Sequence, residues 1–195
     1  MGRIAEIERI TKETQIRLKF DLDGSGKCDI TTGIPFFDHM LTLFTVHGFF
    51  DLMISANGDL DVDFHHTVED IGLVLGQAIK DTTGEKKGVA RYGYAVTPMD
   101  DALATVAVDL SNRPFLVYNL PTCTNFNDAF DAGTAKEFFR AFTNTGLFNL
   151  HINVQYGENL HHVLEAIFKS TGRALNQACG MDSRIKGIRS SKGSL

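Results

Sequence analysis

The sequence lacks the features that would place the chain in a membrane or in an oxidising compartment. No apolar run approaches the roughly 18 residues of a membrane-spanning helix. The charged opening "MGRIAEIERITKET" contains no apolar signal-peptide core. The chain has 3 cysteines, Cys28, Cys123 and Cys179, which are widely spaced and form no CxxC pair. We interpret them as small core or surface residues. These absences predict a cytoplasmic protein.

Positive charge is also scarce. The chain has 19 Lys and Arg against 24 Asp and Glu, for a formal net charge of -5, and its cations form no basic block. This pattern argues against a nucleic-acid partner. What the sequence does have is 43% hydrophobic residues over 195 positions, which is enough for a substantial core.

The chain resembles itself. The segment "HHTVEDIGLVLGQAIKD" at 65–81 aligns with "HHVLEAIFKSTGRALNQ" at 161–177, and "GFFDLMISANG" from Gly48 parallels "GLFNLHINVQYG" from Gly146. The matching segments keep their order, which indicates an internal duplication. We expect two repeats, 1–87 and 88–183, followed by a tail at 184–195.

Hydrophobic periodicity predicts the same element order in both repeats. In the first, "TQIRLKFDLDG" alternates as a half-buried strand, and Gly24-Ser25-Gly26 is expected to turn it into a hairpin. A helix over "PFFDHMLTLFTVHG", a strand over "FFDLMISANG", a short strand over "DLDVDF" and a helix from His66 follow. In the second, we expect strands near 103–119, a helix near 135–145, a strand at 147–155 and a helix from 161. This order predicts an α+β fold with one sheet layer and one helix layer per repeat.

Two copies of an HHxxE motif carry the candidate chemistry. On a helix, Glu69 lies about one turn after both His65 and His66. Neutral imidazoles with a carboxylate suit a divalent transition metal, and the second copy supplies the same set at His161, His162 and Glu165. A single motif is more simply read as a polar first helical turn. Its repetition favours two metal ions.

Three further histidines are candidates on weaker grounds. His39 lies beside Asp38 on the polar side of the first helix, where metal binding and simple exposure are equally good interpretations. His47 precedes Gly48, a position typical of an interaction with helix C-terminal carbonyls. His151 lies on the same face of its expected strand as the polar residues Asn149, Asn153 and Gln155. It is therefore expected to face solvent or a neighbouring subunit.

Several motifs resemble the imidazoleglycerol-phosphate dehydratase family of histidine biosynthesis over essentially the whole chain. They are "TGIPFFDHML", "HGFFDL", "HHTVEDIGLVLGQA", "DLSNRPFLVYN", "EFFRAF", "GENLHHVLEAIFKS" and "SSKG". The resemblance implies a duplicated unit of the ribosomal protein S5 domain 2-like type. It also implies two Mn²⁺ ions per active site, and a homo-oligomer of 24 subunits with sites between chains.

The resemblance also implies a set of metal ligands. They are His39, His65, His66, Glu69, His161, His162 and Glu165. The sequence departs from the family at Glu137, in "KEFFR", where many relatives have histidine; glutamate still suits Mn²⁺ but adds a negative charge. A second departure is Leu43, where some relatives carry a glutamine that could contact substrate.

Phosphate recognition is expected, again from the resemblance, at basic and hydroxyl residues in the second repeat and the tail. They are Arg91, Arg113, Lys169, Ser191 and Lys192. Arginine offers phosphate a planar fork, lysine a point charge and serine a hydroxyl donor. The tail "RIKGIRSSKGSL" is therefore expected to become ordered over bound phosphate.

The implied reaction is loss of water from imidazoleglycerol phosphate to give imidazole acetol phosphate. The proton to be removed is weakly acidic, because no carbonyl adjoins its carbon. A ring bound as imidazolate between two cations could expel the neighbouring hydroxyl and form a diazafulvene-like intermediate, which makes that proton acidic. Glu13 matches the family's proposed acid/base residue, Asp100 is expected to contact a substrate hydroxyl, and Glu165 could assist.

Two other functions remain open from the residues. A dinuclear metallohydrolase acting on a phosphorylated substrate would use a similar ligand set, and structural metal ions could hold an assembly together. The metal is open as well, since Mn, Fe, Co, Ni and Zn all accept these ligands.

Overall fold

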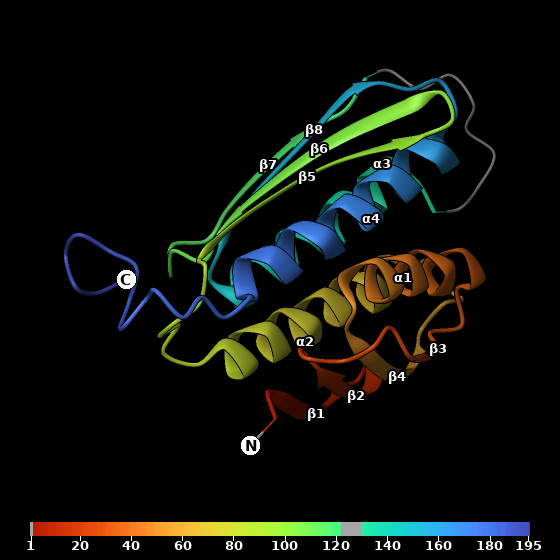
Figure 1. The fold of residues 1–195 in the computed structure, drawn as a ribbon. Coiled ribbons are helices and arrows are strands. Elements are labelled where there is room, and N and C mark those ends of the chain that lie inside the picture. Colours follow the sequence, from red (N-terminus) through yellow and green to blue (C-terminus); the bar gives the residue numbers. More distant parts are fainter. Residues whose placement is uncertain (1, 122–129) are drawn as a thin grey trace.

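The computed structural model describes residues 2–121 and 130–195, and both repeats of the chain form a sheet with two helices on one face (Figure 1). The first contains β1 (Ile4–Ile10), β2 (Thr14–Asp21), β3 (Cys28–Thr31), α1 (Pro35–Gly48), β4 (Asp51–Gly58) and α2 (His65–Thr83). The second contains β5 (Tyr92–Met99), β6 (Ala102–Asp109), β7 (Phe115–Asn119), α3 (Ala132–Gly146), β8 (Asn149–Tyr156) and α4 (Leu160–Cys179). The predicted α+β class and its two-layer units are confirmed.

The two sheets have the same topology. Their strand orders are β1-β2-β4-β3 and β5-β6-β8-β7, with β3 parallel to β4 and β7 parallel to β8. The predicted hairpin at Gly24-Ser25-Gly26 is therefore wrong. β2 pairs with β1 and β4, and the backbone N–H of Gly26 donates to the carbonyl of Phe50 instead of closing a turn. Alternation identifies a strand and its buried face but does not identify the neighbouring strand.

The short strand predicted over "DLDVDF" is also absent. Residues 59–64 form turns, in which the Val62 N–H donates to the Asp59 carbonyl at 2.8 Å, and the Val62 side chain is exposed. The alternating apolar residues occupy a loop that leads directly into α2. Because the loop is short, it holds Asp59 close to the first turn of that helix.

The helices of the two repeats pack against one another between the sheets (Figure 1). α1 lies against α4, and α2 lies against α3. Phenylalanine fills this interface: the ring centroids of Phe37 and Phe138 are 5.3 Å apart, and those of Phe44 and Phe142 are 6.0 Å apart. Burial of these rings from both repeats joins the repeats through one continuous core.

Glycines let the paired helices approach closely. A Cβ atom on Gly172 of α4 would lie 2.3 Å from the Phe44 carbonyl oxygen of α1. A Cβ atom on Gly76 of α2 would lie 2.5 Å from the Phe142 carbonyl oxygen of α3. Gly76 and Gly172 are equivalent positions in the duplication, so the two helix pairs share one register.

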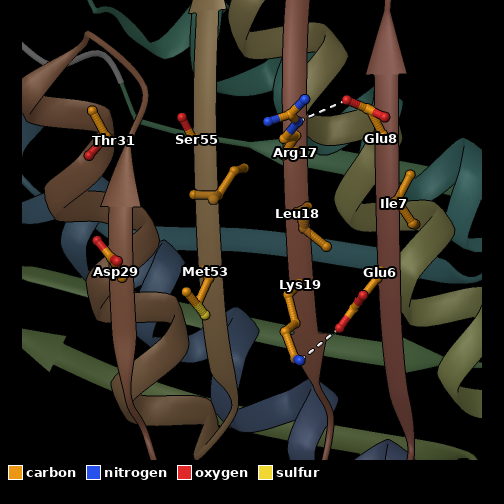
Figure 2. Close-up of a pocket in the computed structure, with 11 residues that line it drawn as sticks. Glu6, Ile7, Glu8, Arg17, Leu18, Lys19, Asp29, Thr31, Met53 and Ser55 are labelled. Carbon is orange, nitrogen blue, oxygen red and sulfur yellow. Dashed lines mark hydrogen bonds and ion pairs between the residues drawn. The ribbon is translucent and has the colours of Figure 1, made fainter.

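The outer face of the first sheet has a shallow hollow of about 650 Å³ (Figure 2). Ion pairs cross its floor, from Arg17 to Glu8 at 2.8 Å and from Lys19 to Glu6 at 2.7 Å. Its lining contains no histidine or cysteine, so it lacks the ligand and nucleophile types of the candidate chemistry.

The structure describes two of the three cysteines, and both are free thiols. Cys28 is exposed and free, Cys179 is buried and free, and Cys123 lies outside the described residues. Burial raises the pKa of the Cys179 thiol to about 12, which makes it unreactive.

None of the helices in the described ranges has the length and apolarity needed to cross a membrane.

Gly172→Ala should destabilise the protein by about 1–3 kcal/mol, because its methyl group forces α1 and α4 apart. Chemical or thermal unfolding measures the loss. Gly187→Ala is the matched control, since a Cβ atom there meets nothing within 4 Å. Equal stability of the two variants would contradict close packing at Gly172.

Candidate active site

One cluster of ligand-type side chains joins the two repeats. In the described part of the chain, His39, His161 and Glu165 form a group whose candidate ligand atoms all lie within 4.8 Å of one another. Glu165 Oε1 is 3.0 Å from the Nε2 atoms of both His39 and His161. His39 comes from α1 and the other two residues from α4, so packing of these helices assembles the cluster.

Glu165 is a buried carboxylate surrounded by donors. Burial raises its pKa, but hydrogen bonds from Lys169, His39 and His161 outweigh that effect and lower the pKa to about 2. Lys169 Nζ donates to Oε2 at 2.5 Å. Glu165 is thus ionised at neutral pH, and two imidazoles with an ionised carboxylate fit a divalent transition metal.

The HHxxE copy on α2 is arranged differently. His65 Nε2 lies 3.5 Å from Glu69 Oε2, one helical turn away. His66 Nδ1 lies 2.9 Å from Asp59 Oδ2, and this hydrogen bond raises the pKa of His66. Within the described residues, this copy forms no three-residue ligand group.

Glu137 occupies the position on α3 that His39 occupies on α1. His39 precedes Phe44 by as many residues as Glu137 precedes Phe142, and the two helix pairs share a register. Glu137 forms an ion pair with Arg140 one turn later. The second departure from the family, Leu43, is partly buried and packs against the core.

The second histidine on α4 is held by a carboxylate that the sequence analysis missed. His162 Nδ1 lies 2.5 Å from Asp101 Oδ1. Asp101 Oδ2 also accepts backbone N–H groups of Glu158 at 2.6 Å and Asn159 at 3.0 Å. The bond from His162, together with those from Asn159 and Glu158, lowers the pKa of Asp101 well below its usual range. No local motif marks Asp101, because its partners lie far along the chain.

Asp100, the predicted substrate contact, lies in the tight turn between β5 and β6. It has a φ of 46°, and 71% of its side chain is exposed. Its Oδ2 is 3.6 Å from His162 Nε2. Glu13 occupies the corresponding turn between β1 and β2, where its side chain is exposed and its carbonyl accepts the Asp59 N–H at 3.1 Å. Each hairpin turn therefore brings a carboxylate towards the histidine pair of its own repeat.

A second group of predicted residues lines a cationic pocket of about 510 Å³ formed with the C-terminal tail. Arg91, Arg113, Ser191 and Lys192 line it, and Arg189 is an additional cation that the sequence analysis did not select. Lys169 is absent from this lining and lies beside Glu165 instead. The structure thus separates the predicted phosphate residues into two places.

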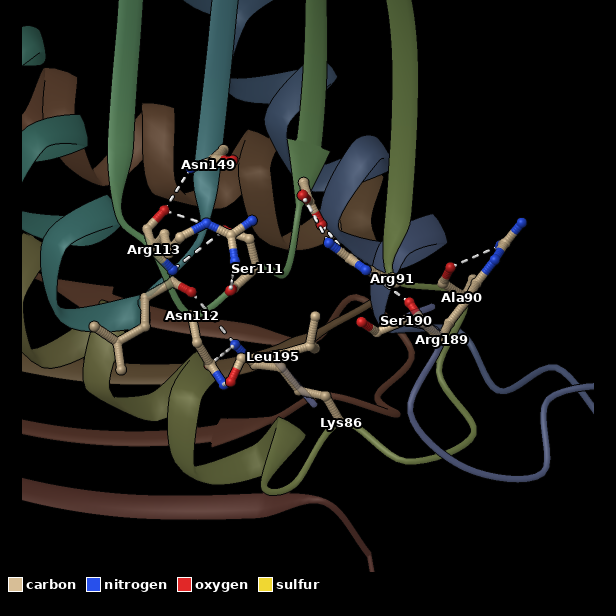
Figure 3. A network of polar contacts seen from close by, with 12 residues as sticks. Lys86, Ala90, Arg91, Ser111, Asn112, Arg113, Asn149, Arg189, Ser190 and Leu195 are labelled. Carbon is tan, nitrogen blue, oxygen red and sulfur yellow. Dashed lines mark hydrogen bonds and ion pairs between the residues drawn. The ribbon is translucent and has the colours of Figure 1, made fainter. Parts of the chain in front are cut away.

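Arg91 fastens the tail to the second sheet (Figure 3). Its Nε and Nη2 donate to Asp109 at 2.7 and 3.2 Å, and this pairing raises the Arg91 pKa. Its Nη1 donates to the Arg189 carbonyl at 2.7 Å, and Arg189 Nη1 donates to the Ala90 carbonyl at 2.9 Å. Arg113 is exposed, which leaves it better placed to meet an anion.

The pocket and the histidine cluster lie at opposite ends of α4. The Arg91 N–H donates to the carbonyl of Ala178 at 2.9 Å, near the end of the helix, whereas His161 lies in its first turn. The intervening helix is about 26 Å long, at roughly 1.5 Å per residue. One subunit therefore does not place both sites beside one small molecule.

Comparison with known proteins decides the family. A family model for imidazoleglycerol-phosphate dehydratase matches residues 32–175. The chain belongs to this family. The dehydratase of Geobacter sulfurreducens is 54% identical over 100% of both chains, and that of Desulfosudis oleivorans is 57% identical over 99% of both.

Solved structures of imidazoleglycerol-phosphate dehydratases have the same fold. The Staphylococcus aureus enzyme has a TM-score of 0.82 and 39% identity, covering 92% of this chain and 99% of that one. The Pyrococcus furiosus enzyme has a TM-score of 0.85 and 38% identity, covering 97% and 100%. The family assignment and the hydro-lyase class are confirmed.

A buried lysine supports the cationic pocket of this dehydratase-family chain (Figure 3). Lys86 is only 2% exposed, and its Nζ donates to Asn112 Oδ1 at 2.6 Å and to the Leu147 carbonyl at 3.3 Å. Asn112 in turn donates to the Leu195 carbonyl at 3.5 Å and directly precedes Arg113. Burial lowers the pKa of Lys86 to about 8.

Lys86 should make stability depend on pH. Its folded-state pKa of about 8 lies below its ordinary value of 10.5, so the unfolded chain binds more protons between these values. The contribution of Lys86 therefore becomes more favourable as pH rises through that window. We expect the difference in thermal unfolding midpoint, wild type minus Lys86→Met, to increase from pH 8 to pH 10.

Lys87→Met is the matched control, because the Lys87 side chain is 64% exposed. Its difference from wild type should stay nearly constant over the same range. A constant difference for Lys86→Met as well would contradict the lowered pKa.

Proposed function

We propose that this chain dehydrates imidazoleglycerol phosphate to imidazole acetol phosphate in histidine biosynthesis, using two Mn²⁺ ions. The observation that carries the proposal is the cluster of His39, His161 and Glu165, which both repeats build together. The names of the full-length relatives supply the substrate. The sequence features support a cytoplasmic location.

The duplication suggests how the ligands divide between two ions. His39, His161 and Glu165 would hold one ion. Their equivalents in the shared helix register, His65, Glu69 and Glu137, would hold the other, with Glu137 replacing an imidazole by a hard oxygen donor. His66 and His162 diverge from the first histidines of their pairs and remain available to complete a shell, including that of a neighbouring subunit.

Separation of the two sites along α4 supports an assembly with active sites between subunits. A three-carbon side chain cannot connect a metal centre to a phosphate pocket about 26 Å away along the same helix. A neighbouring copy would bring its own pocket, with Arg113, Ser191, Lys192 and Arg189, close to this cluster. We propose a homo-oligomer of 24 subunits, the assembly implied by the resemblance.

Glu13 is the proposed proton-transfer residue. When bound, the metal ions supply positive charge that stabilises the substrate ring as imidazolate. The ring can then expel its neighbouring hydroxyl, and Glu13 takes the side-chain proton from the resulting diazafulvene-like intermediate to give an enol that becomes the ketone. Asp100, exposed in its turn, would hold a substrate hydroxyl. Glu165 is better suited to metal binding than to donating a proton, because its pKa is about 2.

Metal-stripped protein should gain dehydratase activity when Mn²⁺ is restored. The assay adds imidazoleglycerol phosphate and follows the enolisable ketone by its ultraviolet absorbance in alkali, while a second assay follows inorganic phosphate. Metal-dependent ketone without phosphate release is the expected result. Phosphate release would support a metallohydrolase, and bound metal without any turnover would support structural ions.

Glu13→Gln should lower kcat by roughly 10²–10⁴-fold, the usual contribution of a positioned acid/base group. Mn²⁺ binding should change little, because Glu13 is not among the proposed metal ligands. Glu8→Gln is a suitable control, since Glu8 is an exposed carboxylate that pairs with Arg17 on the neighbouring strand. Undiminished turnover by Glu13→Gln would remove Glu13 from the mechanism.

A further inference from the structure

The second histidine of each HHxxE motif has the same kind of partner. His66 Nδ1 is bonded to Asp59 at 2.9 Å, and His162 Nδ1 is bonded to Asp101 at 2.5 Å. The two aspartates are not equivalent in the duplication, since Asp59 follows β4 whereas Asp101 lies between β5 and β6. The two repeats therefore use different loops to make the same contact.

This contact determines which ring nitrogen is available. An ionised carboxylate accepts hydrogen bonds and donates none, so Nδ1 must carry the proton. In a neutral imidazole, the lone pair is then on Nε2. We propose that Asp59 and Asp101 are positioning residues that hold His66 and His162 in the tautomer and orientation needed to bind a metal through Nε2. This inference rests on the metal centre proposed above.

Asp101 is the more tightly constrained of the two. Its Oδ2 accepts hydrogen bonds from the backbone N–H groups of Glu158 and Asn159. Any atom at the position of Oδ2 must therefore be a hydrogen-bond acceptor. In Asp101→Asn, the amide oxygen would occupy that place and the NH₂ group would face His162 Nδ1. An NH₂ group donates, so it would favour the tautomer with the proton on Nε2, which blocks metal binding.

Asp59 provides a contrasting case in the same fold. Its Oδ1 is buried, and no hydrogen-bond partner for it lies among the described residues. In Asp59→Asn, no backbone donor requires the amide oxygen to face away from His66. The oxygen can therefore continue to accept the Nδ1–H, and the favourable tautomer can persist.

The test measures Mn²⁺ binding to the full-length, metal-stripped assembly, using the electron paramagnetic resonance signal of free Mn²⁺. Wild type is compared with Asp101→Asn, Asp59→Asn and Asp101→Glu, which restores a carboxylate acceptor. Circular dichroism melting of each metal-free variant identifies any loss of folding. Asp101→Asn should weaken one class of site by about 10–100-fold. Asp59→Asn should weaken binding less, and Asp101→Glu should recover part of the affinity.

Wild-type affinity in folded Asp101→Asn would overturn the inference. Equal weakening by both Asn variants would also overturn it, because loss of charge alone would then explain the effect. If Asp101→Asn fails to fold, Asp101→Glu decides: affinity no better than that of His162→Ala would overturn the role of Asp101. Absence of Mn²⁺ binding by wild type is a distinct result, which would overturn the proposed metal centre itself.

Discussion

Close packing of α1 on α4 is the contact on which the site depends. The absence of a side chain at Gly172 lets the two helices approach until the Phe44 carbonyl oxygen lies 2.3 Å from where a Cβ atom would be. That approach brings His39 of one repeat to His161 and Glu165 of the other. Because the buried rings of Phe37 on α1 and Phe168 on α4 also pack across this interface, with centroids 6.4 Å apart, the geometry of the cluster follows from the packing of the core.

Charge within the cluster is balanced by the protein itself. Burial alone would favour a protonated Glu165, but Lys169 and two imidazoles keep it ionised. A carboxylate already ionised and already held by both histidines needs little rearrangement to become a ligand. The turns carrying Glu13 and Asp100 lie at the exposed ends of the hairpins, where proton transfer and substrate contact are possible.

Different forces organise the other end of α4. Arg91 donates to the Arg189 carbonyl and Arg189 donates to the Ala90 carbonyl, which ties down the tail, and Lys86 holds the turn that leads to Arg113. A cationic pocket is thus built from the junction between the repeats and from the last residues of the chain. Its distance from the histidine cluster supports the association between subunits proposed above, because one subunit does not place both sites beside one small molecule.

The sequence by itself determined the duplication, the α+β class and the placement of both histidine pairs in first helical turns, because periodicity and motif spacing are local properties. It did not identify the neighbours of β2, since its alternation is compatible with more than one partner. Asp59, Asp101 and Arg189 were missed for a related reason: their importance comes from partners that no local motif specifies. Only the tertiary structure decided that His39 lies in one cluster with His161, and that Lys169 lies beside Glu165 and not in the pocket with Arg91. The reason is that helix packing sets distances that a linear pattern does not contain.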